Sequence, residues 1–150
     1  MNPWADTAIR QLLDRAAIQD VLLRYARGVD RRDLELVASC FTPDATYEGV
    51  LARGTIGEAL ASLPARMARY ESTLHVIGNQ LIELCGDTAR SETYALAYHR
   101  LTRAGMPQLR TVAVRYLDEL IRDGDTWRIR QRVVKTEWER TEPLPGTTQE

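Results

Sequence analysis

The sequence predicts an α+β fold in which helices precede a long antiparallel sheet. From Thr7 to about Val29, apolar residues recur at steps of three and four, which is typical of an amphipathic helix. From Thr73 onward the pattern favours four strands, at about 73–85, 88–103, 108–122 and 126–140. Glycine-containing turns separate these stretches and predict hairpins. Helices followed by such a meander indicate the α+β class, with a sheet that curls and helices that close one side.

The first helix should end near Gly28, because glycine is common where helices terminate. A second, shorter helix is expected from about Arg32 to Cys40. Pro43 should end it, since proline cannot continue a helix. A long helix followed by a short one is therefore expected in the first third of the chain.

A short strand and a third helix come next. Ala45 to Val50 favours a strand, and Gly54 indicates a turn. A helix is expected from Gly57 to about Tyr70. Pro64 predicts either a kink in this helix or a restart of the helix just before it.

Length and composition indicate a single domain over residues 1–150, with a tail from about residue 142. Hydrophobic residues make up 44% and charged residues 27%, which is near the globular average. The net charge of −1, with arginines interleaved with acids, argues against nucleic acid as a partner. The start of the chain does not resemble a signal peptide, and no apolar run is long enough to span a bilayer. We therefore expect a cytoplasmic protein that does not contact a membrane.

Cysteine usage and motif content argue against a cofactor. Cys40 and Cys85 lie in apolar surroundings without a C-x-x-C spacing, so we expect buried free thiols. The sequence contains neither a metal-ligand cluster nor a glycine-rich phosphate loop, and a nucleophile elbow is also absent. We expect no metal and no other cofactor.

The two histidines both fall inside predicted strands. His75 shares strand parity with Ile77, and His99 with Ala97, so both face apolar neighbours. Either histidine alone is more often a hydrogen-bonded core residue than a catalytic group. The hairpin turn lies near the midpoint between them, however, which would bring them to a similar level on one face. The small alanine beside His99 also leaves room for a cavity.

Asp30 follows the apolar stripe of the first helix. It is either a solvated residue at the helix terminus or one half of a catalytic pair. A carboxylate that binds one ring nitrogen of histidine fixes the tautomer and leaves the other nitrogen as a base. Removal of a proton from carbon needs such a base in a dry pocket. Asp30 and His75 are therefore the candidate pair.

Three stretches carry a family resemblance: "AAIQDVLLRYARGVDRRDLELVASCFTPDATYEG", "LHVIGNQLIEL" and "DGDTWRIRQRVVKTEW". They resemble the SnoaL-like branch of the nuclear transport factor 2-like superfamily. This branch includes scytalone dehydratase, bile-acid 7α-dehydratase and hexachlorocyclohexane dehydrochlorinase. The resemblance implies a strongly curved antiparallel sheet and N-terminal helices that enclose a cone-shaped cavity.

The resemblance also implies roles for five residues. Asp30 and His75 fall where the lyases of this branch keep a catalytic dyad. His99 aligns with a second pocket histidine and Tyr25 with a pocket tyrosine, and either could donate a hydrogen bond as an imidazolium or a phenol. Arg130 lies near a pocket arginine, although its parity with neighbouring arginines equally favours an outward, solvated face.

The function that this resemblance implies is a cofactor-independent lyase, a dehydratase or dehydrohalogenase that acts on a hydrophobic cyclic small molecule. An isomerase or a polyketide-cyclase-like enzyme could use the same base, and a small-molecule-binding protein without catalysis is a third possibility. Apolar residues on both faces of the sheet further predict a homodimer or homotrimer.

Overall fold

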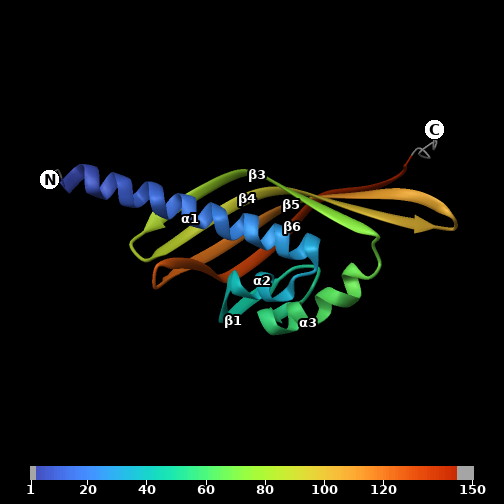
Figure 1. The fold of residues 1–150 in the computed structure, drawn as a ribbon, viewed down its shortest axis with the longest axis horizontal. Coiled ribbons are helices and arrows are strands. Elements are labelled where there is room, and N and C mark those ends of the chain that lie inside the picture. Colours follow the sequence, from blue (N-terminus) through green and yellow to red (C-terminus); the bar gives the residue numbers. More distant parts are fainter. Residues whose placement is uncertain (1–2, 145–150) are drawn as a thin grey trace.

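The computed structural model describes residues 3–144 as three helices and one six-stranded sheet (Figure 1). The helices are α1 (Pro3–Arg31), α2 (Leu34–Ser39) and α3 (Ile56–Met67). The strands are β1 (Phe41–Glu48), β2 (Arg53–Thr55), β3 (Ser72–Cys85), β4 (Thr88–Arg103), β5 (Met106–Asp123) and β6 (Thr126–Pro143). The predicted α+β class and the four long strands are confirmed.

The sheet is mixed, with the order β2-β1-β6-β5-β4-β3. β3 to β6 form the predicted antiparallel meander, whereas β1 runs parallel to β6. Pro43 lies inside β1 rather than before it, at a gap in the register between Phe41 and Thr46. Proline is tolerated there because the gap requires no backbone N–H in the ladder. Gly54, predicted as a turn, belongs to β2, which pairs with β1.

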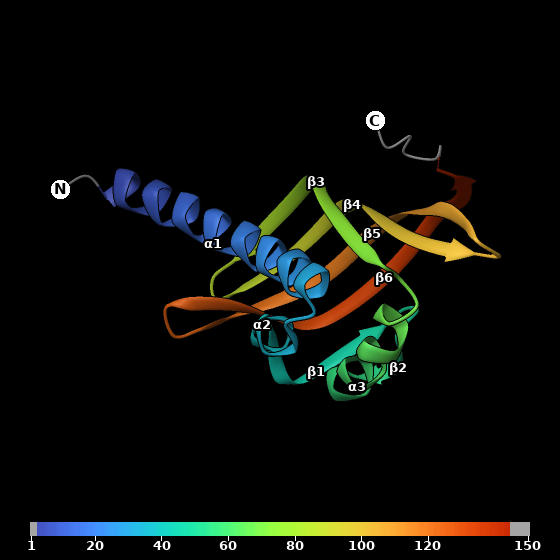
Figure 2. The same ribbon diagram turned by 45° about the vertical axis from the view of Figure 1, so that its right-hand side comes forward.

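The helices cover one face of the curved sheet. Figure 2 shows α1 crossing this face as a long rod, with α2 and α3 beside β1 and β2 at the other end. α1 packs against β3 and β6. Its first turns extend beyond the sheet, and Trp4, Ile9, Leu12 and Leu13 are exposed there (Figure 1). The C-terminal half of α1 supplies buried residues to the core.

The end of α1 differs from the prediction, because the helix continues through Gly28 to Arg31. Arg32 then adopts a left-handed φ of 57°. Its N–H donates to the carbonyl of Val29, and the N–H of Asp33 donates to that of Gly28, which is the Schellman pattern. Gly28 is needed for packing instead: an added Cβ would lie 2.7 Å from Cγ2 of Val37 in α2.

α3 begins with a capping box and runs through Pro64 without interruption. The hydroxyl of Thr55 accepts from the N–H of Glu58, and the carboxylate of Glu58 accepts from the N–H of Thr55. The helix ends at Met67, three residues before the predicted end. Arg32 then donates to the carbonyls of Met67 and Tyr70 and so holds the end of α3 against the end of α1.

Register slips at three places in the pairing of the long strands shift the side-chain parity. The β3–β4 register slips between Ile77 and Gln80, so Ile82 is buried and Leu81 is exposed. Counting alternate residues from His75 would place Leu81 on the inner face and Ile82 on the outer face, so the slip reverses them. A second slip in the β5–β6 pairing leaves Arg130 unpaired, so parity changes along β6 as well.

The outer face of the sheet carries exposed apolar side chains. They are Leu74, Val76, Leu81, Tyr94 and Trp138. The predicted dimer or trimer depends on this face, and it stays a prediction.

Cys40 is buried as expected, but Cys85 is exposed because it ends β3 at the hairpin turn. The predicted tail begins at about residue 142, so its first residues belong to the end of β6 and to Leu144. Residues 145–150 of that tail lie outside the described residues. Between residues 3 and 144, no helix is long and apolar enough to cross a membrane.

Gly28→Ala should destabilise the protein by about 1–3 kcal/mol, because the new methyl group overlaps Val37. Gly57→Ala is the matched control, since its Cβ would meet only the Thr55 hydroxyl at 3.7 Å. This control should change the free energy of unfolding by less than about 1 kcal/mol. Urea unfolding measures both, and equal effects would contradict the close packing of α1 on α2.

Candidate active site

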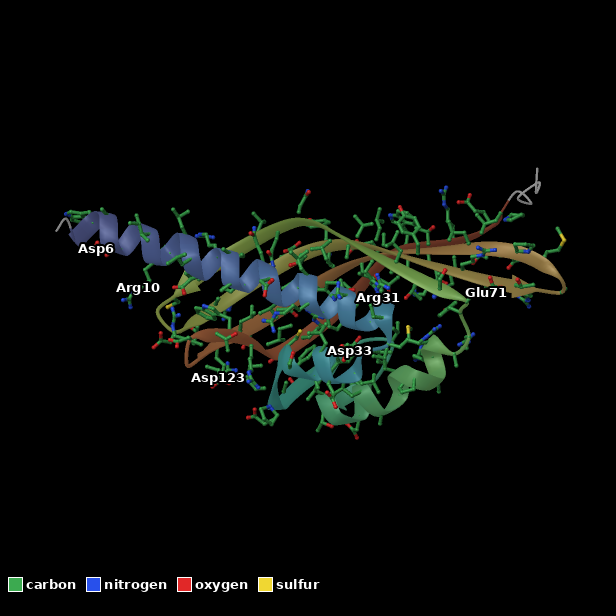
Figure 3. All side chains as sticks on the ribbon, viewed as in Figure 1. Asp6, Arg10, Arg31, Asp33, Glu71 and Asp123 are labelled. Carbon is green, nitrogen blue, oxygen red and sulfur yellow. The ribbon has the colours of Figure 1, made fainter. Side chains whose placement is uncertain are left out.

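Asp30 and His75 form a hydrogen-bonded pair between the end of α1 and the start of β3. Nδ1 of His75 lies 2.7 Å from Oδ1 of Asp30, and the backbone N–H of His75 donates to Oδ2 at 2.8 Å. The hydroxyl of Thr73 adds a third hydrogen bond to Oδ1 at 2.9 Å. Figure 3 labels Arg31 and Asp33, which flank this helix end. The helix terminus therefore places the carboxylate directly on the strand that carries the histidine.

These contacts define the charge and the tautomer of the pair. Burial opposes ionisation of Asp30, but the hydrogen bonds from the His75 ring, the His75 backbone and Thr73 outweigh it and hold the pKa of Asp30 below its usual value. The ionised carboxylate only accepts hydrogen bonds, so Nδ1 of His75 carries the hydrogen. Nε2 then has a free lone pair, which is the arrangement of a general base.

One cavity opens between the inner face of the sheet and the helices, and both histidines line it. Apolar side chains from α1, α3 and the strands form much of its wall. Tyr25, Tyr47 and Tyr116 add three nearly buried phenols. Asp30 does not line the cavity; it lies behind His75. A substrate in the cavity would therefore meet the imidazole and not the carboxylate.

His99 lies next to His75, with the two ring centroids 6.0 Å apart. Burial and the neighbouring His75 lower the pKa of His99 to about 4, so its ring is neutral near pH 7 and is not the imidazolium that the sequence suggested. Nδ1 lies 3.4 Å from the carbonyl of Arg110, which can only accept. The Nε2 atom of His99 is then an acceptor, suited to a substrate hydroxyl. The ring of Tyr70 packs against the imidazole of His99, with the two ring centroids 4.5 Å apart.

Tyr25 lies over a buried cation. The Arg132 guanidinium carbon is 4.2 Å from the ring of Tyr25 and 4.4 Å from that of Tyr116. Arg132 forms two hydrogen bonds of 2.8 Å to Asp118, and both side chains are fully buried. Burial raises the pKa of Tyr25, although the nearby Arg132 opposes this. The phenol stays protonated and can donate a hydrogen bond into the cavity.

Arg130 is the candidate residue that the structure places elsewhere. Its guanidinium is about half exposed and donates to Glu119 at 3.0 Å. It borders a surface hollow with Glu83 and Arg90 rather than the cavity. The bulge at Arg130 is the physical reason, because it separates the outward Arg130 from the inward Arg132 by a change of parity. Arg130 therefore faces solvent, which was the alternative to a pocket position, whereas Arg132 faces the interior.

Several residues of the site were not identified from the sequence. Thr73 shares strand parity with His75, and this signal could have found it. Arg132 was hidden by the bulge, and Arg110 and Tyr70 come together only through the tertiary fold, with a 3.0 Å hydrogen bond from the guanidinium to the phenol. Among the residues that the structure describes, no three His, Cys, Asp or Glu side chains are grouped to hold a metal ion.

Comparison with known proteins identifies the family. The profile of the SnoaL-like domain family matches residues 10–133. The chain belongs to the SnoaL-like family. An uncharacterized protein of Mycobacterium tuberculosis is 28% identical over 84% of this chain and 87% of its own length. The curated relatives of this SnoaL-like protein thus supply no activity.

Solved structures support the same fold. Hexachlorocyclohexane dehydrochlorinase LinA-type3 from Novosphingobium barchaimii superposes with a TM-score of 0.77 and 24% identity, over 93% of this chain and 95% of that chain. A candidate scytalone dehydratase from Novosphingobium aromaticivorans has a TM-score of 0.76 and 20% identity, over 87% and 88% of the two chains. An NTF2-like protein from the latter species, with a TM-score of 0.69 and 23% identity, covers 89% of this chain and 88% of its own. The predicted nuclear transport factor 2-like fold is confirmed.

The Asp30–His75 hydrogen bond predicts a specific proton NMR signal. A ring N–H held at 2.7 Å from a carboxylate should give a strongly downfield imidazole resonance near neutral pH. Asp30→Asn should weaken or abolish this signal, because a neutral amide is a poorer acceptor than a carboxylate. His99→Gln is the control and should retain it. A signal that survives in Asp30→Asn would contradict the pair.

His99 should titrate with a pKa of about 4, followed by the ring C–H resonances. Because this value lies below the unfolded value of 6.5, the unfolded chain binds the proton more readily. His99 should thus cost no stability above about pH 6.5 and should lower stability as the pH falls from there to about 4. His75→Gln should raise the pKa of His99, since the neighbouring His75 is one of the causes that lower it. A pKa of His99 near 6.5 in the wild type would refute the buried, neutral ring.

Proposed function

We propose that the protein is a cofactor-independent lyase, a dehydratase or dehydrohalogenase that acts on a hydrophobic cyclic small molecule. The observation that carries the proposal is the Asp30–His75 pair, in which Asp30 holds Nδ1 while the imidazole lines a largely apolar cavity. An imidazole in such a cavity can act as a base, and the carboxylate behind it stabilises the imidazolium that forms. The relatives named as a dehydrochlorinase and a dehydratase support this class.

The proposed reaction divides the work between two walls of the cavity. His75 takes a proton from carbon through Nε2, and the electron pair of the broken C–H bond forms the new double bond. The leaving group departs with the bonding electrons, either as halide or as hydroxide that takes the proton held by Nε2 of His75 and leaves as water. Tyr25 can donate a hydrogen bond to the departing group or to a developing oxyanion, because its phenol stays neutral. His99 accepts from a substrate hydroxyl and so orients the ring.

His75→Ala should lower kcat by about a hundredfold or more, as loss of a general base does. Asp30→Asn should follow it, because the imidazole loses its tautomer and orientation. The assay is chloride release from hexachlorocyclohexane, together with absorbance changes across a panel of cyclic β-hydroxy ketones. Arg130→Gln is the matched control and should leave kcat unchanged, since Arg130 lies outside the cavity.

Two outcomes would contradict this proposal. If His75→Ala turns over substrate normally while it remains folded, the base is another group. If substrate carbon exchanges its hydrogen with D₂O without loss of a leaving group, the same pair serves an isomerase rather than a lyase.

A further inference from the structure

The cavity lining carries an excess of positive charge at its solvent end. Arg66, Arg69 and Arg110 line it, and Glu139 is its only carboxylate. The whole chain has a net charge of −1, so this local excess does not reflect a basic protein. Charged side chains that line a pocket act mainly by selecting the charge of what enters.

Of these arginines, only Arg110 has its charge compensated. It donates to the Tyr70 hydroxyl at 3.0 Å and pairs with Glu139. Arg66 and Arg69 lie in and just after the last turn of α3, and both are exposed. Within residues 3–144, no carboxylate pairs with either of them. Two guanidinium groups are therefore available to an incoming ligand.

The fold holds these arginines at the mouth of the site. The segment after α3 leads directly into β3, the strand that carries His75. Arg32 fixes this segment through the carbonyls of Met67 and Tyr70, and the N–H of Glu71 donates to the carbonyl of Arg100. Figure 3 labels Glu71 at the start of this strand. Arg66 and Arg69 thus lie on an anchored segment.

We propose that the substrate is amphipathic, with a ring-bearing apolar body and one anionic group. The body lies in the cavity beside His75, and the anion lies at the mouth against Arg66 and Arg69. A carboxylate, a sulfonate or a phosphate shares the required chemistry, and a carboxylate best matches the fork of a guanidinium. This inference narrows the proposed function by naming a substrate class, and it rests on that function for the chemistry but not for binding.

The test compares naphthoate with naphthalenemethanol, which have the same rings and differ in charge. Wild-type protein should bind naphthoate more tightly than naphthalenemethanol, as measured by intrinsic fluorescence or NMR titration. Added salt should weaken the binding of naphthoate and leave the binding of the alcohol unchanged. The double variant Arg66→Gln/Arg69→Gln should weaken naphthoate binding by roughly three- to tenfold, since exposed ion pairs contribute little each. Binding of the alcohol should not change. Naphthalenesulfonate and naphthyl phosphate, tested in parallel, rank the anions.

Two controls locate the effect. Arg10→Gln removes an exposed arginine near the far end of α1 (Figure 3) and should leave naphthoate binding intact. Movement of the His75 and His99 ring resonances on titration places the probe in the cavity. The proposal is overturned if acid and alcohol bind equally to the wild type, if the double variant weakens both alike, or if Arg10→Gln has the same effect as the double variant.

Binding and turnover fail separately in this design. Wild-type protein that binds naphthoate more tightly than the alcohol but eliminates a leaving group from no substrate would overturn the proposed lyase and leave the anion site in place. Wild-type protein that eliminates a leaving group but binds acid and alcohol equally would overturn the anion site and leave the proposed lyase in place.

Discussion

The three hydrogen bonds that converge on Asp30 are the constraint on which the site depends. They join the last turn of α1 to Thr73 and His75 at the start of β3, residues that lie more than forty positions away along the chain. A helix end and a strand end are otherwise free to slide, because apolar packing is not directional. The carboxylate fixes both their distance and their rotation. The same contact that docks α1 over the sheet therefore also aims the imidazole into the cavity.

Deep burial of charge imposes a second constraint on the opposite wall. Arg132 and Asp118 are fully buried, so each needs the other, and removal of one partner from such a pair typically costs about 3–5 kcal/mol. The rings of Tyr25 and Tyr116 enclose the guanidinium and replace part of its lost hydration through their π faces. These rings in turn form cavity wall. The shape of the cavity and the stability of the buried pair are thus coupled through two tyrosines.

Much of the fold follows from local pattern, since the long helix and four long strands show strong periodicity and their turns carry glycine. The errors occur where tertiary pairing overrides local signals. β1 pairs in parallel with a strand from the other end of the chain, and Gly54 becomes part of β2 because β1 offers it a partner. Gly28 indicates a helix end but is used for close approach to Val37. Such choices depend on contacts that the sequence does not display.

The candidate site shows the same division. His75, His99 and Tyr25 line one cavity with Asp30 behind His75, as the family resemblance predicted. The register slip between Ile77 and Gln80 contributes to this arrangement, because beyond it Thr73 pairs with His99 and His75 pairs with Ala97, so both histidines lie on the same face. Arg130 and Arg132 lie on either side of a parity change in β6, so counting alternate residues assigns them wrongly. A single unpaired residue is enough to do this, and nothing local in "RIRQRV" marks its position.

The distribution of charge along the cavity gives the site its chemical character. Its inner part contains groups that burial keeps neutral: the pKa of His99 is lowered to about 4, and the pKa values of Tyr25 and Tyr116 are raised. Ionised arginines stand at the mouth, where water compensates them. A low-dielectric interior strengthens each remaining polar contact. His75 is the one inner group with a carboxylate behind it to receive a new positive charge. In the proposed reaction, proton transfer is therefore directed to a single atom, Nε2 of His75, while the neighbouring groups donate or accept hydrogen bonds.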